Sequence, residues 1–431
     1  MKVRAVFDIG KSNKKLFLFD ENFQEVKRLY TEIPEIKDED DFPCDDLAAI
    51  EKWVKESLFS LLDDDTYNIQ SLNFSTYGAS FVHIGKDGKA LSPLYNYLKP
   101  YPEKLLQTFY DQYGDALTIA RETASPPLAM LNSGLQLYWL KHERPQLYQQ
   151  LYCSLHLPQY LSFLFSGKLV SEYTSIGCHT ALWDYQKRAY HRWVYAEGIE
   201  KKLAAIQPTT QTFQQNIEGI HMKIGPGIHD SSAALIPYLK KSSEPFMLLS
   251  TGSWNIVLNP FNQEALTTEE LRMDCLNFIQ IDGQAVKASR LFLGNEYKIW
   301  TKKLAKHFQK YPGIHKQMNP QSDILNKLEY LPEQVYAWES ITTYPSSIST
   351  DLSLFPDYET AYHKLMQELV ELQIRALHLA KGKTSIQKLY VDGGFIDNEL
   401  FLLLLAKGLP QLEILPAHNP IGSALGAAMV L

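Results

Sequence analysis

The sequence predicts an α/β protein of two domains, and three observations lead to that prediction. Short apolar runs typical of strands alternate with longer runs at helical spacing, which is the pattern of the α/β class. The chain has 431 residues, more than one hydrophobic core usually supports. A pattern of strand, glycine turn and strand near the N-terminus recurs in the second half, which indicates two related domains. We therefore expect domains over residues 1–242 and 243–431, with a cleft between them.

In the first domain, three strands are predicted over 4–7, 16–19 and 25–30, separated by polar turns. A helix follows over 45–62, where aliphatic residues recur at helical spacing and Asp45 or Asp46 can cap the N-terminus. Beyond it we expect a strand, a mostly helical stretch, a loop-rich stretch and a short helix, over 71–75, 126–167, 187–226 and 231–239.

The second domain is predicted to open with strands over 246–250 and 254–258, joined by a glycine turn. A long amphipathic helix over 358–381 then leads to a buried type of strand over 388–391. Asp392-Gly393-Gly394 follows that strand and precedes another helix.

The composition excludes several classes of function. The formal net charge of −7 and the lack of a Lys/Arg stripe argue against a nucleic-acid partner. The cysteines are far apart and never form Cys-x-x-Cys, so we predict neither a zinc site nor a disulfide framework. The N-terminus lacks an apolar signal core, and the longest apolar run is shorter than the roughly 20 residues that span a bilayer. We expect a cytoplasmic protein without membrane contact.

The first glycine turn, Asp8-Ile9-Gly10-Lys11-Ser12, has two interpretations. Glycine lets backbone N–H groups approach a phosphate closely, while Lys11 and Ser12 add charge and hydrogen bonds. Asp8 can hold Mg²⁺ through water, because this ion keeps several waters and prefers carboxylate oxygen. A plain hairpin turn explains the same residues, so this turn alone does not decide between them.

Two further glycine turns are equally ambiguous. Thr251-Gly252-Ser253 is either a hairpin turn or a second phosphate loop that holds the same nucleotide as the first. Asp392-Gly393-Gly394 lies where a strand passes into a helix, a position at which open α/β sheets bind ligands. The alternative there is a helix entry turn with Asn398 or Asp397 as the cap.

Asp230 follows His229 and begins a predicted helix. It is either the N-cap of that helix or a general base that takes a proton from a sugar hydroxyl as this oxygen attacks the γ-phosphate. Such a base accelerates a reaction by about 10²- to 10⁴-fold. The two roles are compatible.

In sequence order, these motifs resemble those of the FGGY carbohydrate kinases, within the actin, hexokinase and Hsp70-like ATPase superfamily. The resemblance covers nearly the whole chain and rests on residues 8–14, 227–234, 250–254 and 392–398. It implies two ribonuclease-H-like domains and a sugar kinase that uses ATP and Mg²⁺. The expected partner is a small-molecule sugar, and a homodimer is the assembly we consider.

The resemblance also implies roles for single residues. Asp230 would be the base, and Asp8 would position Mg²⁺. The nucleotide would be bound by the two phosphate loops and the adenosine segment, namely Gly10, Lys11, Ser12, Asn13, Lys14, Thr251, Gly252, Ser253, Gly393, Gly394 and Asn398. The sugar would meet Gly78, His229, Asp230 and Arg290.

Residues 76–81 and 172–175 are similar to the rhamnulokinase and fuculokinase branch of that family. That branch carries acidic residues where Ser75 and Ser80 stand, and Trp where Tyr77 stands. Because a lost carboxylate removes hydrogen-bond acceptors for sugar hydroxyls, these differences leave the identity of the sugar open. We expect a deoxy-ketose such as L-rhamnulose or L-fuculose, with xylulose or another pentulose as the alternative. A non-catalytic nucleotide-binding regulator is the third hypothesis, and the His229-Asp230 pair argues against it.

Overall fold

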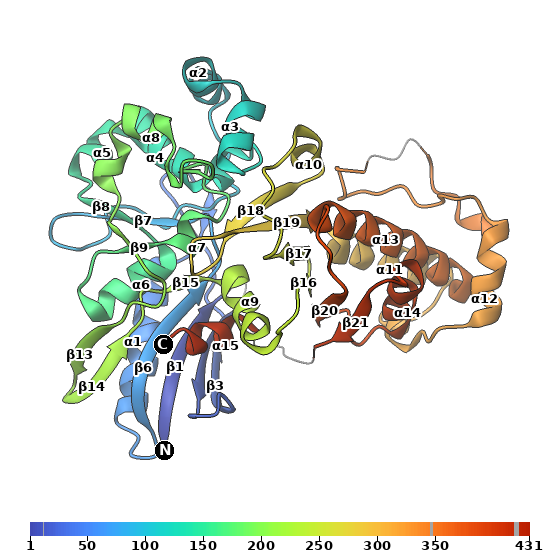
Figure 1. Cartoon of the computed structure of the whole chain (residues 1–431), viewed down its shortest axis with the longest axis horizontal. Coiled ribbons are helices and arrows are strands. Elements are labelled where there is room, and N and C mark those ends of the chain that lie inside the picture. The colour runs from blue at the N-terminus through green and yellow to red at the C-terminus, as the bar shows by residue number, and fades with distance from the viewer. Residues whose placement is uncertain (12, 345–347, 418–421) are drawn as a thin grey trace. The chain divides into compact units, whose positions relative to one another are not determined.

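A computed structural model describes the chain apart from residues 12, 345–347 and 418–421 (Figure 1). The chain divides into two compact units, each described by itself below. The first unit comprises Met1–Lys241, Asn277–Ala285 and Ile421–Leu431, and the second comprises Ser242–Leu276 and Val286–Pro420. Two stretches that we expected in the second domain, 277–285 and 421–431, therefore belong to the first unit.

The first unit is built on a mixed sheet whose strand order is β13-β14-β6-β1-β2-β3, with β15 also paired to β6. β1, β2 and β3 form an antiparallel meander, while β6 lies parallel to β1. The bounds are β1 Lys2–Ile9, β2 Lys14–Phe19, β3 Glu25–Thr31, β6 Asn68–Thr76, β13 Phe213–Ile217, β14 Ile220–Ile224 and β15 Ile228–His229. The small strand pairs are β4 Ile36–Lys37 with β5 Pro43–Cys44, β7 Phe81–Ile84 with β8 Cys153–His156, β9 Ser171–Glu172 with β12 Ile206–Gln207, and β10 Trp183–Asp184 with β11 Ala189–Tyr190.

Helix α1, Leu47–Leu62, packs its apolar face on this sheet. Asp46 caps it by accepting a hydrogen bond from the Ala49 N–H at 2.9 Å. Phe7 of β1 stacks on Phe74 of β6, with ring centroids 5.8 Å apart. The remaining helices of the unit are α2 Glu103–Tyr113, α3 Ala116–Thr123, α4 Ser133–Glu143, α5 Pro145–Gln150, α6 Leu157–Ser166, α7 Tyr173–Ile176, α8 Arg192–Ala196, α9 Asp230–Lys241 and α15 Gly422–Met429.

Two predicted stretches of the first unit differ from the structure. The loop-rich stretch over 187–226 contains β13 and β14, which extend the main sheet. The mostly helical stretch over 126–167 contains β8, which pairs with β7. These strands are short and carry few of the residues that favour strands, so pairing with distant strands decides their conformation.

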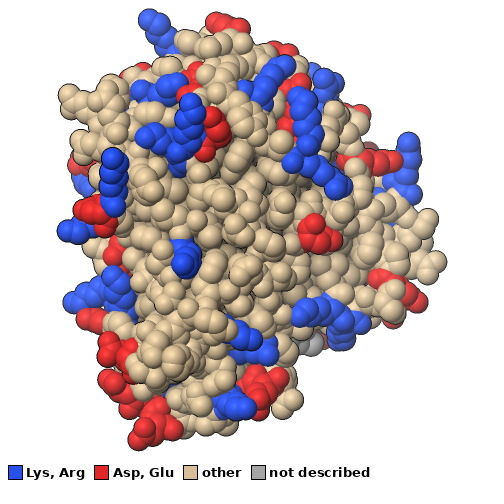
Figure 2. Space-filling view, turned by 60° about the vertical axis from the view of Figure 1, so that its left-hand side comes forward, with Lys and Arg blue, Asp and Glu red and all other residues tan. Residues whose placement is uncertain are grey.

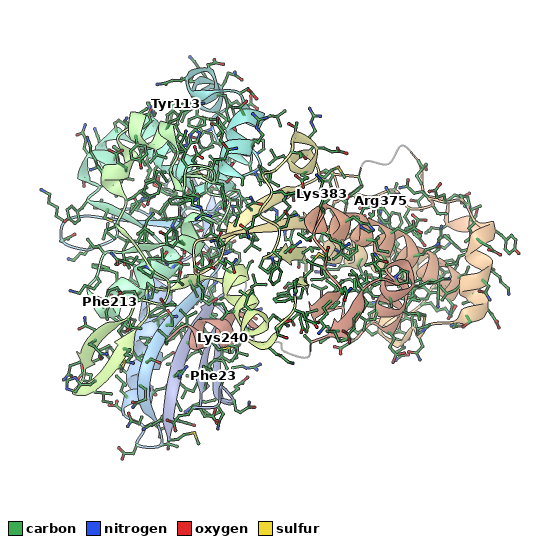
Figure 3. The ribbon with its side chains drawn as sticks, viewed as in Figure 1. Phe23, Tyr113, Phe213, Lys240, Arg375 and Lys383 are labelled. Carbon is green, nitrogen blue, oxygen red and sulfur yellow. The ribbon has the colours of Figure 1, made fainter. Side chains whose placement is uncertain are left out.

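The C-terminal helix α15 packs closely on α9, which explains why it belongs to the first unit. A Cβ added at Gly426 would lie 1.8 Å from the carbonyl oxygen of Ala233, so only glycine permits this approach. Lys240 of α9 donates a hydrogen bond to the Met429 carbonyl at 2.6 Å, and Figure 3 labels this lysine. Contacts between residues so far apart in sequence leave no local signal.

The second unit is built on a sheet of order β18-β19-β17-β16-β20-β21, in which residues 277–279 of β18 and Ala285 of β19 fall in the stretch assigned to the first unit. Its strands are β16 Phe246–Thr251, β17 Asn255–Asn259, β18 Cys275–Ile279, β19 Ala285–Leu291, β20 Lys388–Gly393 and β21 Glu413–Pro416. Its helices are α10 Thr268–Arg272, α11 Leu293–His307, α12 Ser322–Lys327, α13 Tyr358–Lys381 and α14 Glu399–Gly408. α13 confirms the predicted helix over 358–381 and contributes more buried residues to the large core around it than any other element of the unit. The mixed sheets and helices of both units confirm the α/β class.

On the face shown in Figure 2, basic and acidic side chains are interspersed, so the described surface in this view shows no field of one sign. Among the described residues, we find no helix that is both long and apolar enough to cross a membrane.

Candidate active site

The first glycine turn joins β1 to β2. Asp8 pairs with Lys15 across this hairpin, and the Gly10 N–H donates to the Asn13 carbonyl at 2.8 Å. A Cβ at Gly10 would lie only 3.1 Å from the same carbonyl oxygen, so a larger residue would strain the turn. Ser12, which we predicted to bind phosphate, lies outside the described residues. The turn is a hairpin, and this geometry is compatible with a phosphate loop.

The two lysines of this turn are held by carboxylates. The Lys11 ammonium donates to Asp45 at 2.6 Å and to Glu35 at 2.8 Å. The Lys14 ammonium is buried, and it donates to the Lys11 carbonyl at 2.9 Å and to Asp45 at 3.3 Å. Lys14 therefore stabilises the turn from inside, and a phosphate contact from this residue would have to come from its backbone. Asp45 gave no functional signal in the sequence.

Asp8 is the last but one residue of β1, and its Oδ1 accepts a hydrogen bond from the Ser423 hydroxyl at 3.1 Å. Burial, and then the negative charge of Asp230, raise the pKa of the Asp8 carboxyl to about 6. Two carboxylates that interact in this way form an environment that a cation would stabilise. We find no group of three or more His, Cys, Asp or Glu side chains placed to hold a metal in the described ranges. The Asp8 carboxylate offers the kind of oxygen ligand that Mg²⁺ prefers when it keeps waters and phosphate oxygens as its other ligands.

The segment with the predicted base lies at the end of β15, beside β6, and Asp230 begins α9. Its Oδ1 accepts hydrogen bonds from the Ser231 N–H at 2.6 Å and the Ser231 hydroxyl at 3.2 Å. His229 Nε2 lies 3.1 Å from the same oxygen. Oδ2 has no hydrogen-bond partner in the part of the chain that the structure describes, and 35% of the side chain is exposed. One oxygen is therefore fixed, and the other can accept a proton.

A buried carboxylate anchors this segment from behind. Glu172 is fully buried and accepts hydrogen bonds from the N–H groups of Thr174 and Ser175, at 2.8 and 2.6 Å, and from the Thr174 hydroxyl at 2.8 Å. The Thr174 hydroxyl in turn accepts from the His229 N–H at 3.0 Å. The backbone before Asp230 is thus tied to a carboxylate that is itself well satisfied.

Residues near Gly78 show where the predicted sugar contacts lie. A Cβ at Gly78 would be 2.4 Å from Cys178 Sγ and 3.2 Å from His229 Cδ2, so the backbone passes close to both side chains. Ser75 and Ser80 are buried. The Tyr77 hydroxyl donates to Asp45 at 2.7 Å. The three positions that depart from the rhamnulokinase and fuculokinase pattern are therefore buried, and Tyr77 belongs to the network of the first turn.

In the second unit, two predicted motifs come together. β16 and β20 are parallel neighbours, and their register places Thr251 beside Gly393. The Thr251 hydroxyl donates to the Asp392 carbonyl at 2.5 Å, and the Gly394 N–H donates to the Thr251 carbonyl at 3.0 Å. Gly393 has φ +89°, and a Cβ there would be 1.9 Å from the Thr251 carbonyl oxygen, so glycine is required on both grounds.

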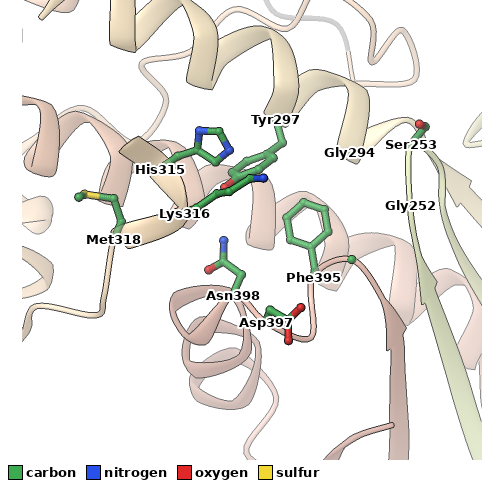
Figure 4. Close-up of a pocket in the computed structure, with 11 residues that line it drawn as sticks. Gly252, Ser253, Gly294, Tyr297, His315, Lys316, Met318, Phe395, Asp397 and Asn398 are labelled. Carbon is green, nitrogen blue, oxygen red and sulfur yellow. The ribbon is translucent and has the colours of Figure 1, made fainter. Parts of the chain in front are cut away.

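These motifs border a cavity of about 530 Å³, a size typical of small-molecule sites. Its lining includes four residues that we predicted to bind nucleotide, Gly252, Ser253, Gly394 and Asn398, and seven that we did not, Gly294, Tyr297, His315, Lys316, Met318, Phe395 and Asp397 (Figure 4). The missed residues come mainly from α11 and from the short helical turn Ile314–Gln317. Gly294, Tyr297, His315, Lys316 and Met318 lie outside every motif that we used, whereas Phe395 and Asp397 lie within the 392–398 segment.

Asn398 has a clear structural role in this cavity. Its Oδ1 accepts from the Phe401 N–H at 3.0 Å, which makes it the N-cap of α14, and its amide donates to the Tyr362 hydroxyl at 2.9 Å. The helix cap that we considered as the alternative is therefore real, and it coexists with a place in the cavity wall.

Arg290 lies in the second unit, on β19. Its guanidinium donates to both carboxylate oxygens of Asp274, at 2.7 and 3.2 Å, and lies over the Trp254 ring at 5.4 Å. Two of its five N–H donors are thus used inside the unit, and the sugar contact that we predicted for it stays a prediction.

Comparison with known proteins gives matches along nearly the whole chain. A family model of the N-terminal domain of the FGGY family of carbohydrate kinases matches residues 3–233, and a model of the carbohydrate kinase FGGY C-terminal domain matches residues 243–431. A curated rhamnulokinase of Oceanobacillus iheyensis is 22% identical over 390 residues, which cover 84% of this chain and 78% of that protein.

Solved structures agree in fold. A carbohydrate kinase from Novosphingobium aromaticivorans superposes with a TM-score of 0.81 at 23% identity, covering 99% of this chain and 93% of that one. A ligand-bound xylulose kinase from Lactobacillus acidophilus also gives a TM-score of 0.81, at 17% identity, covering 100% of this chain and 89% of that one.

Proposed function

The chain belongs to the FGGY family of carbohydrate kinases, and we propose that it transfers the γ-phosphate of ATP to a hydroxyl of a ketose. The observation that carries this proposal is the geometry of Asp230. Its Oδ1 is fixed by Ser231 and lies within hydrogen-bond distance of His229, while Oδ2 has no partner among the described residues. A carboxylate held in this way suits a general base.

In the reaction, Asp230 Oδ2 takes the proton of the sugar hydroxyl as that oxygen forms a bond to the γ-phosphorus. The bond between the γ-phosphorus and the bridging oxygen breaks, and ADP leaves with the electron pair. Ser231 keeps the other carboxylate oxygen in place during this step. The products are a sugar phosphate, ADP and the proton on Asp230, which then passes to solvent.

For the nucleotide, we propose that the cavity of the second unit takes the nucleoside of ATP. Gly252, Gly393 and Gly394 have no side chain to obstruct a phosphate, and nothing lies within 4 Å of a Cβ built at Gly394. In the first unit, Gly10, Lys11 and Asn13 form the turn that we propose as the other phosphate loop. Asp8 would hold Mg²⁺, which when bound offsets the negative charge of the phosphates.

For the sugar, we propose a deoxy-ketose such as L-rhamnulose or L-fuculose. The similarity to a rhamnulokinase over most of the chain supports this choice. Xylulose or another pentulose is the second candidate, which the similarity in fold to a xylulose kinase favours. A nucleotide-binding regulator is the least supported reading, because it would not need a carboxylate with one fixed and one available oxygen.

We further propose a cytoplasmic location. Cys44, Cys153 and Cys275 are buried thiols that form no disulfide within the described part of the chain, which suits a reducing compartment. A homodimer stays a prediction.

The test is ADP release, measured with a coupled assay across a panel of ketoses, aldoses and polyols. We expect turnover that depends on one class of ketose and falls by about 10²- to 10⁴-fold in Asp230→Asn. Asp115→Asn is the matched control, because Asp115 only caps α3, accepting from the N–H groups of Leu117 and Thr118 at 3.0 Å. Unchanged turnover in Asp230→Asn would exclude this residue as the base, and ADP release that no sugar stimulates would favour the regulator.

A further inference from the structure

The backbone that leads into Asp230 is connected at two points to one buried carboxylate. This lead-in segment, residues 227–229, includes β15 and ends where α9 begins. Glu172 is fully buried, and the side chains of Thr174 and Gln159, which are buried as well, join it to the segment. These two residues belong to α7 and α6, so two different elements connect the carboxylate to the same stretch of backbone.

The Thr174 hydroxyl forms the first connection. It donates to Glu172 Oε1 at 2.8 Å and accepts from the backbone N–H of His229 at 3.0 Å. Because a hydroxyl has only one proton, the bond to the carboxylate leaves a lone pair of the oxygen to accept from the backbone. The position of the His229 N–H, one residue before Asp230, therefore depends on the carboxylate that orients this hydroxyl.

The Gln159 amide forms the second connection. Its Nε2 donates to the Gly227 carbonyl at 3.2 Å and to Glu172 Oε1 at 3.4 Å. Both neighbours are acceptors, so the NH₂ end of the amide, which has two protons, faces them. The backbone of α6 also lies close to the segment, because a Cβ at Gly227 would be 2.4 Å from the Pro158 carbonyl oxygen. Gly227 has φ +85°, so glycine is needed here on both grounds.

Glu172 can orient both bridging side chains because its own carboxylate is fixed. Oε1 also accepts from the Ser175 N–H at 2.6 Å, and Oε2 accepts from the Thr174 N–H and the Thr209 hydroxyl, both at 2.8 Å. Together with the two bridges, five donors surround this carboxylate. Hydrogen bonds to a carboxylate are short and strong, so the group is held in one orientation inside the first unit.

Asp230 takes its position from this backbone. The hydrogen bonds that its carboxylate accepts from described residues come from its neighbour Ser231, so the place of the carboxylate depends on where the chain enters α9. We propose that Thr174 and Gln159 are positioning residues for catalysis, through which Glu172 fixes the lead-in segment and thereby the Asp230 carboxylate. The proposal rests on the proposed function of Asp230 as the base. It gives a function to a buried carboxylate that the proposed reaction itself does not use.

The experiment measures the steady-state kinetics of Thr174→Val, Thr174→Ala and Thr174→Ser. Valine and alanine both remove the bridging hydroxyl, and alanine does so without depending on how a second methyl group packs. We expect kcat to fall about 10- to 100-fold in both, because a misplacement of about 1 Å costs up to about 10²-fold, while the KM for ATP is unchanged. Thr174→Ser keeps the hydroxyl and should retain most of kcat. A loss in Thr174→Ser as large as in Thr174→Val, or a parallel rise in the KM for ATP, would overturn the proposal.

Thr209→Val is the matched control. Thr209 is also buried, and its hydroxyl donates to the same carboxylate at the same distance of 2.8 Å, but no hydrogen bond joins it to the lead-in segment, all of which is described. It should leave kcat unchanged. Equal losses in Thr209→Val and Thr174→Val would mean that only the satisfaction of Glu172 matters, and would overturn the proposal. Gln159→Leu removes the second bridge and should lower kcat in the same way, whereas an unchanged kcat would overturn the role of Gln159.

Two further readouts separate this proposal from the identity of the base. Hydrogen exchange of the His229 amide needs no turnover, and it should be faster in Thr174→Val than in the wild type or Thr209→Val. An unchanged exchange rate would overturn the bridge even if Asp230→Asn is inactive. In an Asp230→Asn background, Thr174→Val should cause no further loss of kcat, because it acts through the base; a further loss as large as in the wild-type background would overturn the proposal. Full activity of Asp230→Asn would refute the base assignment itself, whatever the exchange rates are.

Discussion

Gly294 lies in the first turn of α11, against the backbone of the turn that we propose as the second phosphate loop. A Cβ at this position would lie 1.8 Å from the Gly252 carbonyl oxygen, 2.9 Å from the Gly252 carbonyl carbon and 3.2 Å from Ser253 Cα. All three neighbours are backbone atoms, so no side chain can rotate away. Because non-bonded heavy atoms normally stay about 3.5 Å apart, Gly294→Ala must move the loop or the helix by more than about 1 Å.

Overpacking of this kind costs about 1 to 3 kcal/mol, and here the displaced atoms line the proposed nucleotide site. ATP binding requires the native conformation of the loop, so most of this free energy is subtracted from binding in the variant. The affinity for ATP then falls about 5- to 150-fold, since each 1.4 kcal/mol is a factor of ten. We expect this loss in calorimetric titrations with ATP or a non-hydrolysable analogue, while thermal unfolding shows that the variant is folded.

Gly408→Ala provides the matched control for Gly294→Ala. A Cβ at Gly408, the last residue of α14, would meet the flexible Ile374 side chain at 2.3 Å from Cδ1, and neither residue lines the cavity. It should change stability but leave ATP affinity intact. A folded Gly294→Ala protein that binds ATP as tightly as the wild type would refute the reasoning that this close approach shapes the loop.

Three further predictions concern separate features. Lys316 is exposed and lines the cavity, so Lys316→Ala should weaken binding of ATP several-fold but not of adenosine, as calorimetry at low salt can test. Burial raises the pKa of Glu368 to about 7 from 4.5, so the folded state keeps a proton that the unfolded chain has lost. Its contribution to unfolding free energy should therefore fall by up to about 3 kcal/mol as the pH rises from 4.5 past 7. Urea unfolding should show a flatter pH dependence in Glu368→Gln. Gly426→Ala would place a Cβ 1.8 Å from the Ala233 carbonyl oxygen of α9. It should therefore lower the melting temperature, and it should reduce kcat because α9, on which Asp230 lies, must shift. An unchanged melting temperature would contradict this prediction.

The parts of the candidate site that the sequence predicted are encoded in short segments. Two or three neighbouring residues are enough to predict each of these positions. They are Asp8 near a strand end, Gly252 in a turn between strands and Gly393 at the end of a buried strand. The long helix α13 was predicted with its observed bounds, because its apolar repeat and its flanking residues are local. Asp230 was found in the same way, as an aspartate that begins a helix.

Other parts of the site depend on residues that chain folding brings together. Ser423 donates to Asp8 from the far end of the sequence, and Lys14 proved to be a buried cation paired with Asp45. The cavity wall formed by Tyr297 and His315 has no motif. Each of these depends on which faces of distant elements pack together, which a local pattern does not contain.

By itself, the sequence determined the α/β class, the glycine turns and the candidate base, because backbone conformation and helix caps depend on near neighbours. Only the tertiary structure decided that the C-terminal helix joins the first unit and that Thr251 lies beside Gly393. It also decided that His229, next to Asp230, lies against Cys178 of a distant segment. These contacts join segments far apart in sequence, and their free energy comes from close packing and hydrogen bonds that exist only once the chain has folded.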